Sequence, residues 1–227
     1  MKLYHGTSTN RLDDILKHGL SPRKDRKCKG NWKDYPSRTD MVYLTSAYPF
    51  YFAATALGED DDPVVFEIDT DLLEEENFFP DEDFIAQGLK DIKNHAKYRK
   101  DLERYQCHWK LSVEKLGNCC YKGVIPAKAI TRYCVLSRKR LDLIGQMLDP
   151  SISLGNFLVL GTWYNNLVKY MFGDIFEIPD KFSGIGVRPI AEDDEFSRMM
   201  QMHDEARIKQ SKNREGITVK EVCHETI

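Results

Sequence analysis

The chain has 227 residues, of which 30% are charged and 41% hydrophobic, and its formal net charge is −3. This length allows one domain, or one domain with an extension, and the composition is ordinary for a globular protein. No apolar run reaches the roughly 18 residues of a membrane span, and no secretion signal is seen, so we expect a cytoplasmic protein without a membrane partner. Six scattered cysteines without Cys-x-x-Cys spacing predict reduced, buried thiols and no metal site.

In chain order, apolar runs and turn residues predict alternating strands and helices. The expected elements are a strand at 3–4, a helix at 10–20, a long polar loop at 21–40, a strand at 41–44, a helix at 46–57, a strand at 64–68, a helix at 85–105, a helical turn at 109–116, a strand at 119–121, a helical turn at 126–130 and a strand at 132–136. Strands separated by single helices with short returns predict an α+β domain over residues 1–138. Residues 139–227 have a different pattern and predict a mainly helical C-terminal extension, with helices at 139–172 and near 192–212.

Charge is strongly segregated along the chain. Residues 59–85 contain thirteen acidic residues and no basic one, whereas residues 23–29 and 90–115 are rich in lysine and arginine. Two interpretations stay open. These stretches are solvated faces, or they are a basic groove for a polyanion beside an acidic patch for a different partner.

The run Tyr4-His5-Gly6-Thr7-Ser8 is the most informative motif. A histidine at the end of a strand, followed at once by glycine, places an imidazole next to backbone that carries no side chain. The imidazole can hydrogen-bond a ribose hydroxyl, and Gly6 lets a planar ring approach the main chain closely. This pattern therefore suits a nucleotide, although most His-Gly pairs are ordinary turn chemistry.

Two further stretches extend this motif into an ordered set. Residues 42–46, followed by Ala53-Ala54, form an apolar strand and a helix of small residues; residues 118–130 combine a late strand, Gly123 and an Ile-Pro step. With the opening strand and helix, they resemble the ADP-ribosyltransferase superfamily, which includes poly(ADP-ribose) polymerases, DarT-like toxins and RNA 2′-phosphotransferases. The resemblance covers residues 3–136. It implies two small mixed sheets that form an NAD cleft, with the catalytic domain at 1–138.

The resemblance also implies roles for individual residues, with NAD as the co-substrate. His5 would hydrogen-bond the ribose next to adenine, and the backbone of Gly6, with Thr7 beside it, would hold the nicotinamide amide. Tyr43 would stack on the nicotinamide ring, because an aromatic face grips a flat cation. Tyr51 is the candidate for a second stacking partner. Both tyrosines are alternatively core aromatics.

The sequence departs from the family at the late strand. Many members carry a glutamate there, which stabilises an oxocarbenium-like transition state, but this chain has Asn118. Asn118 can hydrogen-bond a ribose hydroxyl but supplies no charge. Glu114, one helical turn earlier, is a candidate carboxylate or else a solvated one, and residues 81–83 offer weaker candidates. The missing glutamate argues against polymer formation and favours transfer of a single ADP-ribose.

Arg38 precedes the second stretch and is a candidate for holding the NAD pyrophosphate or assisting proton transfer. RNA 2′-phosphotransferases share the His-Gly pair, lack the glutamate and use arginines to hold a phosphate. The full arginine set of that family is absent here, so an RNA 2′-phosphotransferase-like activity ranks second. An arginine on a polar loop is otherwise usually solvated.

The acceptor of the ADP-ribose is suggested by the basic loop 23–33, which includes Trp32. Cationic and aromatic side chains together track a phosphate backbone and stack on bases, so we expect RNA or single-stranded DNA as acceptor. A protein side chain is the main rival. The resemblance further suggests a toxin or antiviral defence effector, with an antitoxin as a candidate partner. A degenerate module that only binds NAD or a partner is the non-catalytic alternative.

Overall fold

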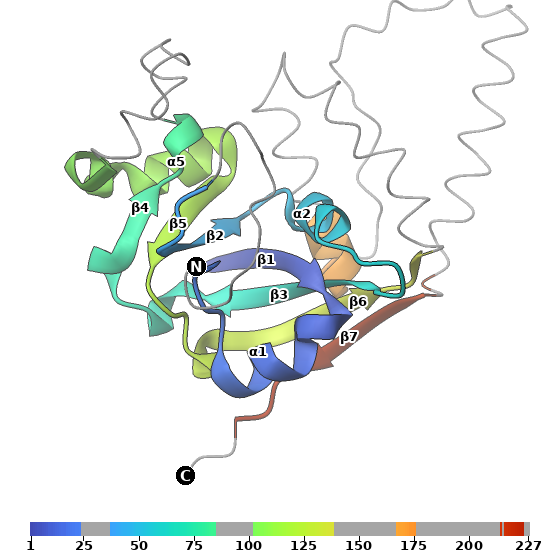
Figure 1. Ribbon diagram of the computed structural model, residues 1–227. Helices are drawn as coiled ribbons and strands as arrows, with labels where there is room; N and C mark the ends of the chain where they lie inside the picture. The colour runs from blue at the N-terminus through green and yellow to red at the C-terminus, as the bar shows by residue number, and fades with distance from the viewer. Residues whose placement is uncertain (24–36, 85–101, 139–166, 176–213, 215, 225–227) are drawn as a thin grey trace, which may run out of the picture.

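The structure is a computed structural model, and it describes residues 1–23, 37–84, 102–138, 167–175, 214 and 216–224 (Figure 1). The strands are β1 Lys2–Ser8, β2 Met41–Thr45, β3 Pro63–Asp69, β4 Phe78–Pro80, β5 Asn118–Lys122, β6 Ile130–Leu136 and β7 Ile217–Glu221. The α-helices are α1 Leu12–His18, α2 Pro49–Thr55 and α5 Trp109–Leu116, and residues 167–172 are also helical. Short 3-10 helices are η1 Thr9–Arg11, η3 Thr70–Leu72, η4 Glu75–Asn77, η6 Leu102–His108 and η7 Ala127–Ala129.

These strands form one seven-stranded sheet in the order β4-β5-β2-β1-β3-β6-β7. Every neighbouring pair is antiparallel. The expectation of two small mixed sheets is therefore wrong, while the mixture of helices and strands is as expected. The sequence also missed β4 and β7, the two strands at the edges of the sheet.

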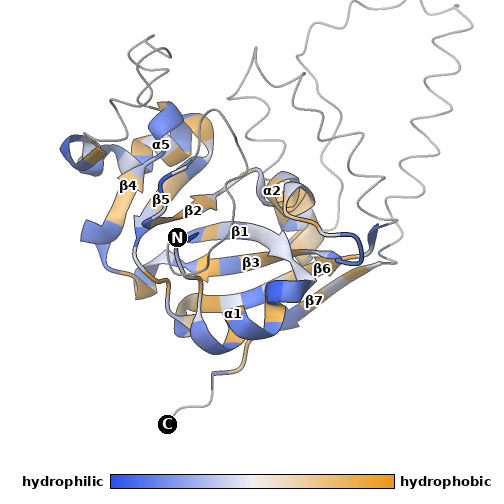
Figure 2. Ribbon diagram, in the orientation of Figure 1, coloured by the Kyte–Doolittle hydropathy of each residue, from blue (hydrophilic) through white to orange (hydrophobic). Residues whose placement is uncertain are grey.

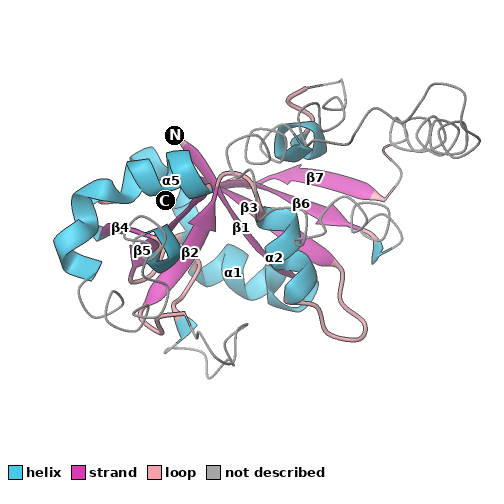
Figure 3. Cartoon of the chain, turned by 90° about the horizontal axis from the view of Figure 1, so that it is seen from above, coloured by secondary structure: helices cyan, strands magenta, loops and turns pink. Residues whose placement is uncertain are grey.

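The sheet is joined in its middle by very little strand pairing. β1 and β3 pair at seven register positions and β2 and β5 at five, but β1 and β2 pair only where Tyr4 faces Thr45. Figure 3, which views the sheet from above, shows β1 and β2 at an angle to one another. We call β4-β5-β2 and β1-β3-β6-β7 the two half-sheets, and the Tyr4–Thr45 pair their junction.

Both faces of the sheet carry buried apolar side chains. One face packs against α1 and α5, whose apolar residues Ile15, Trp109 and Val113 join the largest core cluster. The other face of the β1-β3-β6-β7 half-sheet packs against α2 and residues 167–172 in a second cluster. Among the described residues, no helix is both long and apolar enough to cross a bilayer.

The chain beyond residue 138 contributes a strand as well as a helix. β7 pairs with β6 over five register positions, so a segment of the predicted extension completes one edge of the sheet. The helices expected at 139–166, at 192–212 and over 85–101 lie outside the described residues, and residues 102–108 form η6. The division of the chain at residue 138 stays a prediction.

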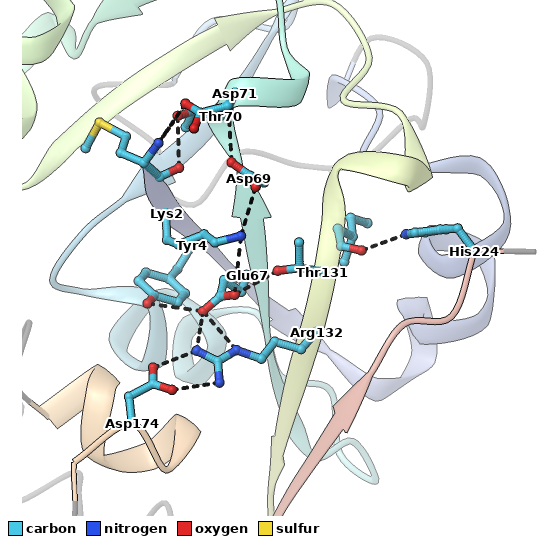
Figure 4. Close-up of polar contacts among 12 residues, drawn as sticks. Lys2, Tyr4, Glu67, Asp69, Thr70, Asp71, Thr131, Arg132, Asp174 and His224 are labelled. Carbon is cyan, nitrogen blue, oxygen red and sulfur yellow. Dashed lines mark hydrogen bonds and ion pairs between the residues drawn. The ribbon is translucent and has the colours of Figure 1, made fainter. Parts of the chain in front are cut away.

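A buried ion network attaches the helical residues 167–172 to the sheet (Figure 4). Glu67 on β3 is 3% exposed, and its Oε2 accepts hydrogen bonds from Nε and Nη2 of Arg132 at 3.0 and 2.6 Å. The same guanidinium donates to both carboxylate oxygens of Asp174 at 2.8 and 2.6 Å. Thr131 adds a 2.7 Å hydrogen bond to Glu67. Burial and the Glu67 carboxylate raise the pKa of Tyr4, whose hydroxyl lies 3.5 Å from Glu67 Oε2.

Removing the shared cation tests this network. We expect Arg132→Met to lower the free energy of unfolding by about 3 kcal/mol, because it leaves the Glu67 carboxylate buried without its guanidinium. Asp174→Asn is expected to lower it by about 1 kcal/mol or less, because Asp174 is 38% exposed. The double variant Glu67→Leu/Arg132→Met should recover most of the loss. Urea unfolding measures all three, and equal losses in the two single variants would contradict this account.

Candidate functional site

His5 lies on β1 one residue past the junction, where β1 and β2 stop pairing. Its Nδ1 lies 2.9 Å from the backbone oxygen of Tyr43 on β2. A carbonyl oxygen only accepts hydrogen bonds, so Nδ1 carries the proton and donates it. In the neutral ring this leaves the lone pair on Nε2. The bond thus fixes both the orientation of the imidazole and the nitrogen that can accept a hydrogen bond.

Gly6 is the point at which α2 rests on β1. A Cβ atom at Gly6 would lie 2.0 Å from the backbone oxygen of Pro49 and 2.5 Å from the backbone nitrogen of Ala53. Pro49 occupies the first turn of α2, where its fixed φ and missing N–H are tolerated. The space on the Cβ side of the glycine is therefore filled by α2, and the contact of the Gly6 backbone with nicotinamide stays a prediction. Thr7 beside it is buried.

A methyl group at this position should separate α2 from β1. We expect Gly6→Ala to lower the free energy of unfolding by about 3 kcal/mol, the upper end of what overpacking costs, because both clashing atoms belong to backbone. Gly58→Ala is the matched control, since its Cβ would meet only the side chain of Asp61, at 3.0 Å. Thermal and urea unfolding of the two variants provide the comparison. Similar stability of both variants would show that α2 shifts without penalty.

Tyr43 on β2 is held at both ends. Its backbone oxygen accepts from His5, and its hydroxyl accepts from the backbone N–H of Arg38 at 2.8 Å. The hydroxyl donates to the carboxylate of Glu82, whose oxygens lie at 2.8 and 3.0 Å. Burial, and then the Glu82 carboxylate, raise the pKa of Tyr43 well above its usual value. The residue as a whole is partly exposed although its hydroxyl is buried.

Arg38 contacts Tyr43 through its backbone N–H, whereas its guanidinium is paired with carboxylates of the protein. Its Nε and Nη2 donate to the two carboxylate oxygens of Asp40 at 2.9 and 2.7 Å, and Nη2 lies 3.7 Å from Glu103. Bidentate pairing of this kind is geometrically specific. The Asp40 carboxylate takes two of the five N–H donors of Arg38, and the role of Arg38 in holding a pyrophosphate stays a prediction.

The Arg38–Asp40 pair has a consequence for acid stability. Hydrogen bonding from Arg38 lowers the pKa of Asp40 below its usual value. Such a group stabilises the folded protein above its unfolded pKa of about 3.9, and the contribution is lost as pH falls through the lower native pKa. We expect the stability difference between the parent chain and Asp40→Asn to be constant above about pH 5 and to shrink in stronger acid. Urea unfolding between pH 2 and 7, at roughly one-unit steps, measures it, and Arg38→Gln should abolish the same pH dependence.

Asn118 begins β5 and pairs in register with Thr45, so it lies on the same row of the sheet as the junction. Its backbone oxygen accepts from Ser112 Oγ at 2.7 Å. Its side-chain Oδ1 is buried and has no hydrogen-bond partner. An unpartnered buried acceptor costs about 1–3 kcal/mol, so this atom is suited to receive a hydrogen bond from a ligand.

Two predicted site residues lie apart from this arrangement. The side chain of Glu114 is 62% exposed and pairs with the neighbouring Lys115. Within the described residues, no hydrogen bond or ion pair joins Glu114 to another candidate residue. Tyr51 on α2 is partly exposed and packs edge-on against Phe52, with ring centroids 5.6 Å apart. The structure therefore brings together His5, Tyr43 and Arg38, but not Glu114 or Tyr51.

Glu82 is the residue that the sequence analysis undervalued. It is 3% exposed and belongs to the helical turn 82–84 that follows β4. The run Phe79-Pro80-Asp81-Glu82-Asp83-Phe84 offered one signal, because apolar residues flank its acids. Its neighbour Asp81 has a pKa raised well above the usual value, by burial and then by the adjacent carboxylates. In the described part of the chain, no group of His, Cys, Asp and Glu side chains could hold a metal ion.

Comparison with known proteins gives little further information. No family model matches the chain, and no curated protein matches it. Six chains among the solved structures do match. One is a structural neighbour titled EcPltA, which is 12% identical, with 62% of this chain and 79% of that chain covered and a TM-score of 0.37. A likeness of this extent supports no argument about fold or activity.

Proposed function

We propose that the chain is an NAD-dependent mono-ADP-ribosyltransferase. The observation that carries the proposal is the fixed imidazole of His5 at the junction, oriented by the Tyr43 carbonyl so that Nε2 is the accepting nitrogen. A ribose hydroxyl is a suitable donor to that nitrogen. The ordered sequence motifs that resemble the ADP-ribosyltransferase superfamily support the same activity.

The proposed reaction uses three groups of the site. His5 holds a ribose hydroxyl, the Tyr43 ring stacks on nicotinamide, and the unpartnered Oδ1 of Asn118 accepts a hydrogen bond from a second hydroxyl. The N-glycosidic bond of NAD breaks, and nicotinamide leaves with the bonding electron pair. The nucleophile of the acceptor then bonds to the same ribose carbon and releases its proton to solvent. Asn118 adds no negative charge, which agrees with transfer of one unit rather than a polymer.

A nucleic acid is the proposed acceptor, either RNA or single-stranded DNA. This part of the proposal is supported by the composition of the basic loop 23–33, of which residues 24–33 lie outside the described part of the chain. A role as a toxin or defence effector in the cytoplasm, with an antitoxin as partner, follows from the family resemblance. The acceptor, the toxin or defence role and the antitoxin are parts of the same proposal.

Labelled NAD tests the activity directly. The purified chain is incubated with adenylate-labelled NAD and, separately, RNA, single-stranded DNA and a protein extract, and both transferred label and released nicotinamide are measured. We expect His5→Ala to lower both about 100-fold, because the ribose loses its orienting partner. Glu114→Gln is the control and should stay within about twofold of the parent chain, because Glu114 is a solvated carboxylate.

Each other outcome favours a different alternative. Label on protein alone would make this a protein ADP-ribosyltransferase, and loss of activity in Glu114→Gln would restore Glu114 as the catalytic carboxylate. Removal of a 2′-phosphate from RNA would favour the phosphotransferase. NAD binding without nicotinamide release would leave only a binding module, and nicotinamide release that survives His5→Ala would contradict the role of His5.

A further inference from the structure

The Glu82 carboxylate is buried where it can act on Tyr43. It is 3% exposed, and both of its oxygens lie within 3.0 Å of the Tyr43 hydroxyl. Removing a carboxylate from water is unfavourable unless hydrogen bonds compensate for the lost hydration. The two short contacts with the Tyr43 hydroxyl provide such compensation.

The hydroxyl of Tyr43 is held from two sides. The N–H of Arg38 donates to it at 2.8 Å, and the hydroxyl donates to Glu82. The backbone of Tyr43 is fixed in β2 by its register with Cys120. The phenol oxygen lies on the axis about which a tyrosine ring turns. With the backbone and this oxygen both fixed, the direction of the ring axis, and with it the χ1 rotamer of Tyr43, is fixed.

The ring itself lies at the boundary between core and solvent. It packs against a small apolar cluster formed by Met41, Phe79, Leu102 and Cys120. Tyr43 as a whole is partly exposed. The carbonyl of the same residue orients His5. The backbone of Tyr43 therefore links an anchored ring to an oriented imidazole.

We propose that Glu82 is a positioning residue of this site: its carboxylate fixes the direction of the Tyr43 ring axis, and so the place of the ring on which the nicotinamide of NAD stacks. The inference rests on the proposed function for the identity of the ligand. Fixing the ring before binding removes an ordering cost of about 0.5–1.5 kcal/mol, which corresponds to roughly 2- to 12-fold in affinity. Glu82 acts through Tyr43 and does not itself touch the nucleotide.

A double-mutant cycle in the full chain tests the pair, with NAD as the probe. Glu82→Ala and Tyr43→Phe are each expected to raise the dissociation constant and KM for NAD by about 5- to 10-fold, with a smaller change in kcat. The double variant should match the single ones, because all three remove the same hydrogen bond. Glu82→Gln keeps an acceptor oxygen and should return the affinity to within about twofold of the parent chain.

Glu103→Ala is the matched control, since Glu103 is an acidic residue near Arg38 that is 52% exposed. It should leave NAD binding unchanged. Additive effects in the double variant, or unchanged NAD affinity in Glu82→Ala, would overturn the positioning role. So would failure of Glu82→Gln to restore the affinity.

The same proteins separate this inference from the proposed function. Absence of NAD binding by the parent chain overturns the proposed function and, with it, the ligand named here. The χ1 rotamer population of Tyr43, measured from NMR couplings in protein with isotope-labelled tyrosine, still tests the anchoring. We expect a single χ1 rotamer in the parent chain and averaging between rotamers in Glu82→Ala, and equal populations in the two proteins would overturn the inference even if NAD binds.

Discussion

The single register pair between Tyr4 and Thr45 is the constraint on which the rest of this fold depends. Thr45 is fixed on its own side, because its hydroxyl donates to the Gly117 oxygen at 2.8 Å and accepts from the N–H groups of Ala47 and Tyr48. One threonine thus ties the end of β2 to the turn before β5 and to the residues that lead into α2. The strand pairing that would normally continue past this point is absent between β1 and β2, and the candidate site lies there.

Each half-sheet has contacts of its own, although the largest core cluster contains apolar side chains of both, such as Leu3 and Val42. In the β1-β3-β6-β7 half-sheet, Arg132 joins Glu67 to Asp174, and α2 rests on Gly6. In the β4-β5-β2 half-sheet, the rings of Phe78 and Trp109 stack with centroids 4.4 Å apart. The His5–Tyr43 hydrogen bond is a second link between the halves. The candidate site therefore lies where the two half-sheets stop pairing.

Local signals predicted local structure well. Gly19 was expected to end the first helix, and it lies after His18 with φ of +79°. The apolar run 64–68 was expected as a strand, and β3 covers it. Local patterns did not indicate β4, whose Phe78 and Phe79 lie between acidic residues and next to a proline; Figure 2 shows β4 as a hydrophobic strand with hydrophilic segments close by. The single sheet and the Tyr43–Glu82 bond were not predictable, because each depends on partners about 40 residues apart along the chain.

The contact between Gly6 and α2 changes how the glycine should be understood in evolutionary terms. A glycine next to a histidine in a nucleotide-binding motif is readily attributed to selection for ligand binding. Here any side chain would collide with the backbone of Pro49 and Ala53. Selection for folding alone is enough to keep glycine at this position. If the proposed activity were lost, Gly6 would still be retained, whereas His5 would be kept only by its hydrogen bond to Tyr43, so the histidine is the better marker of function in related sequences.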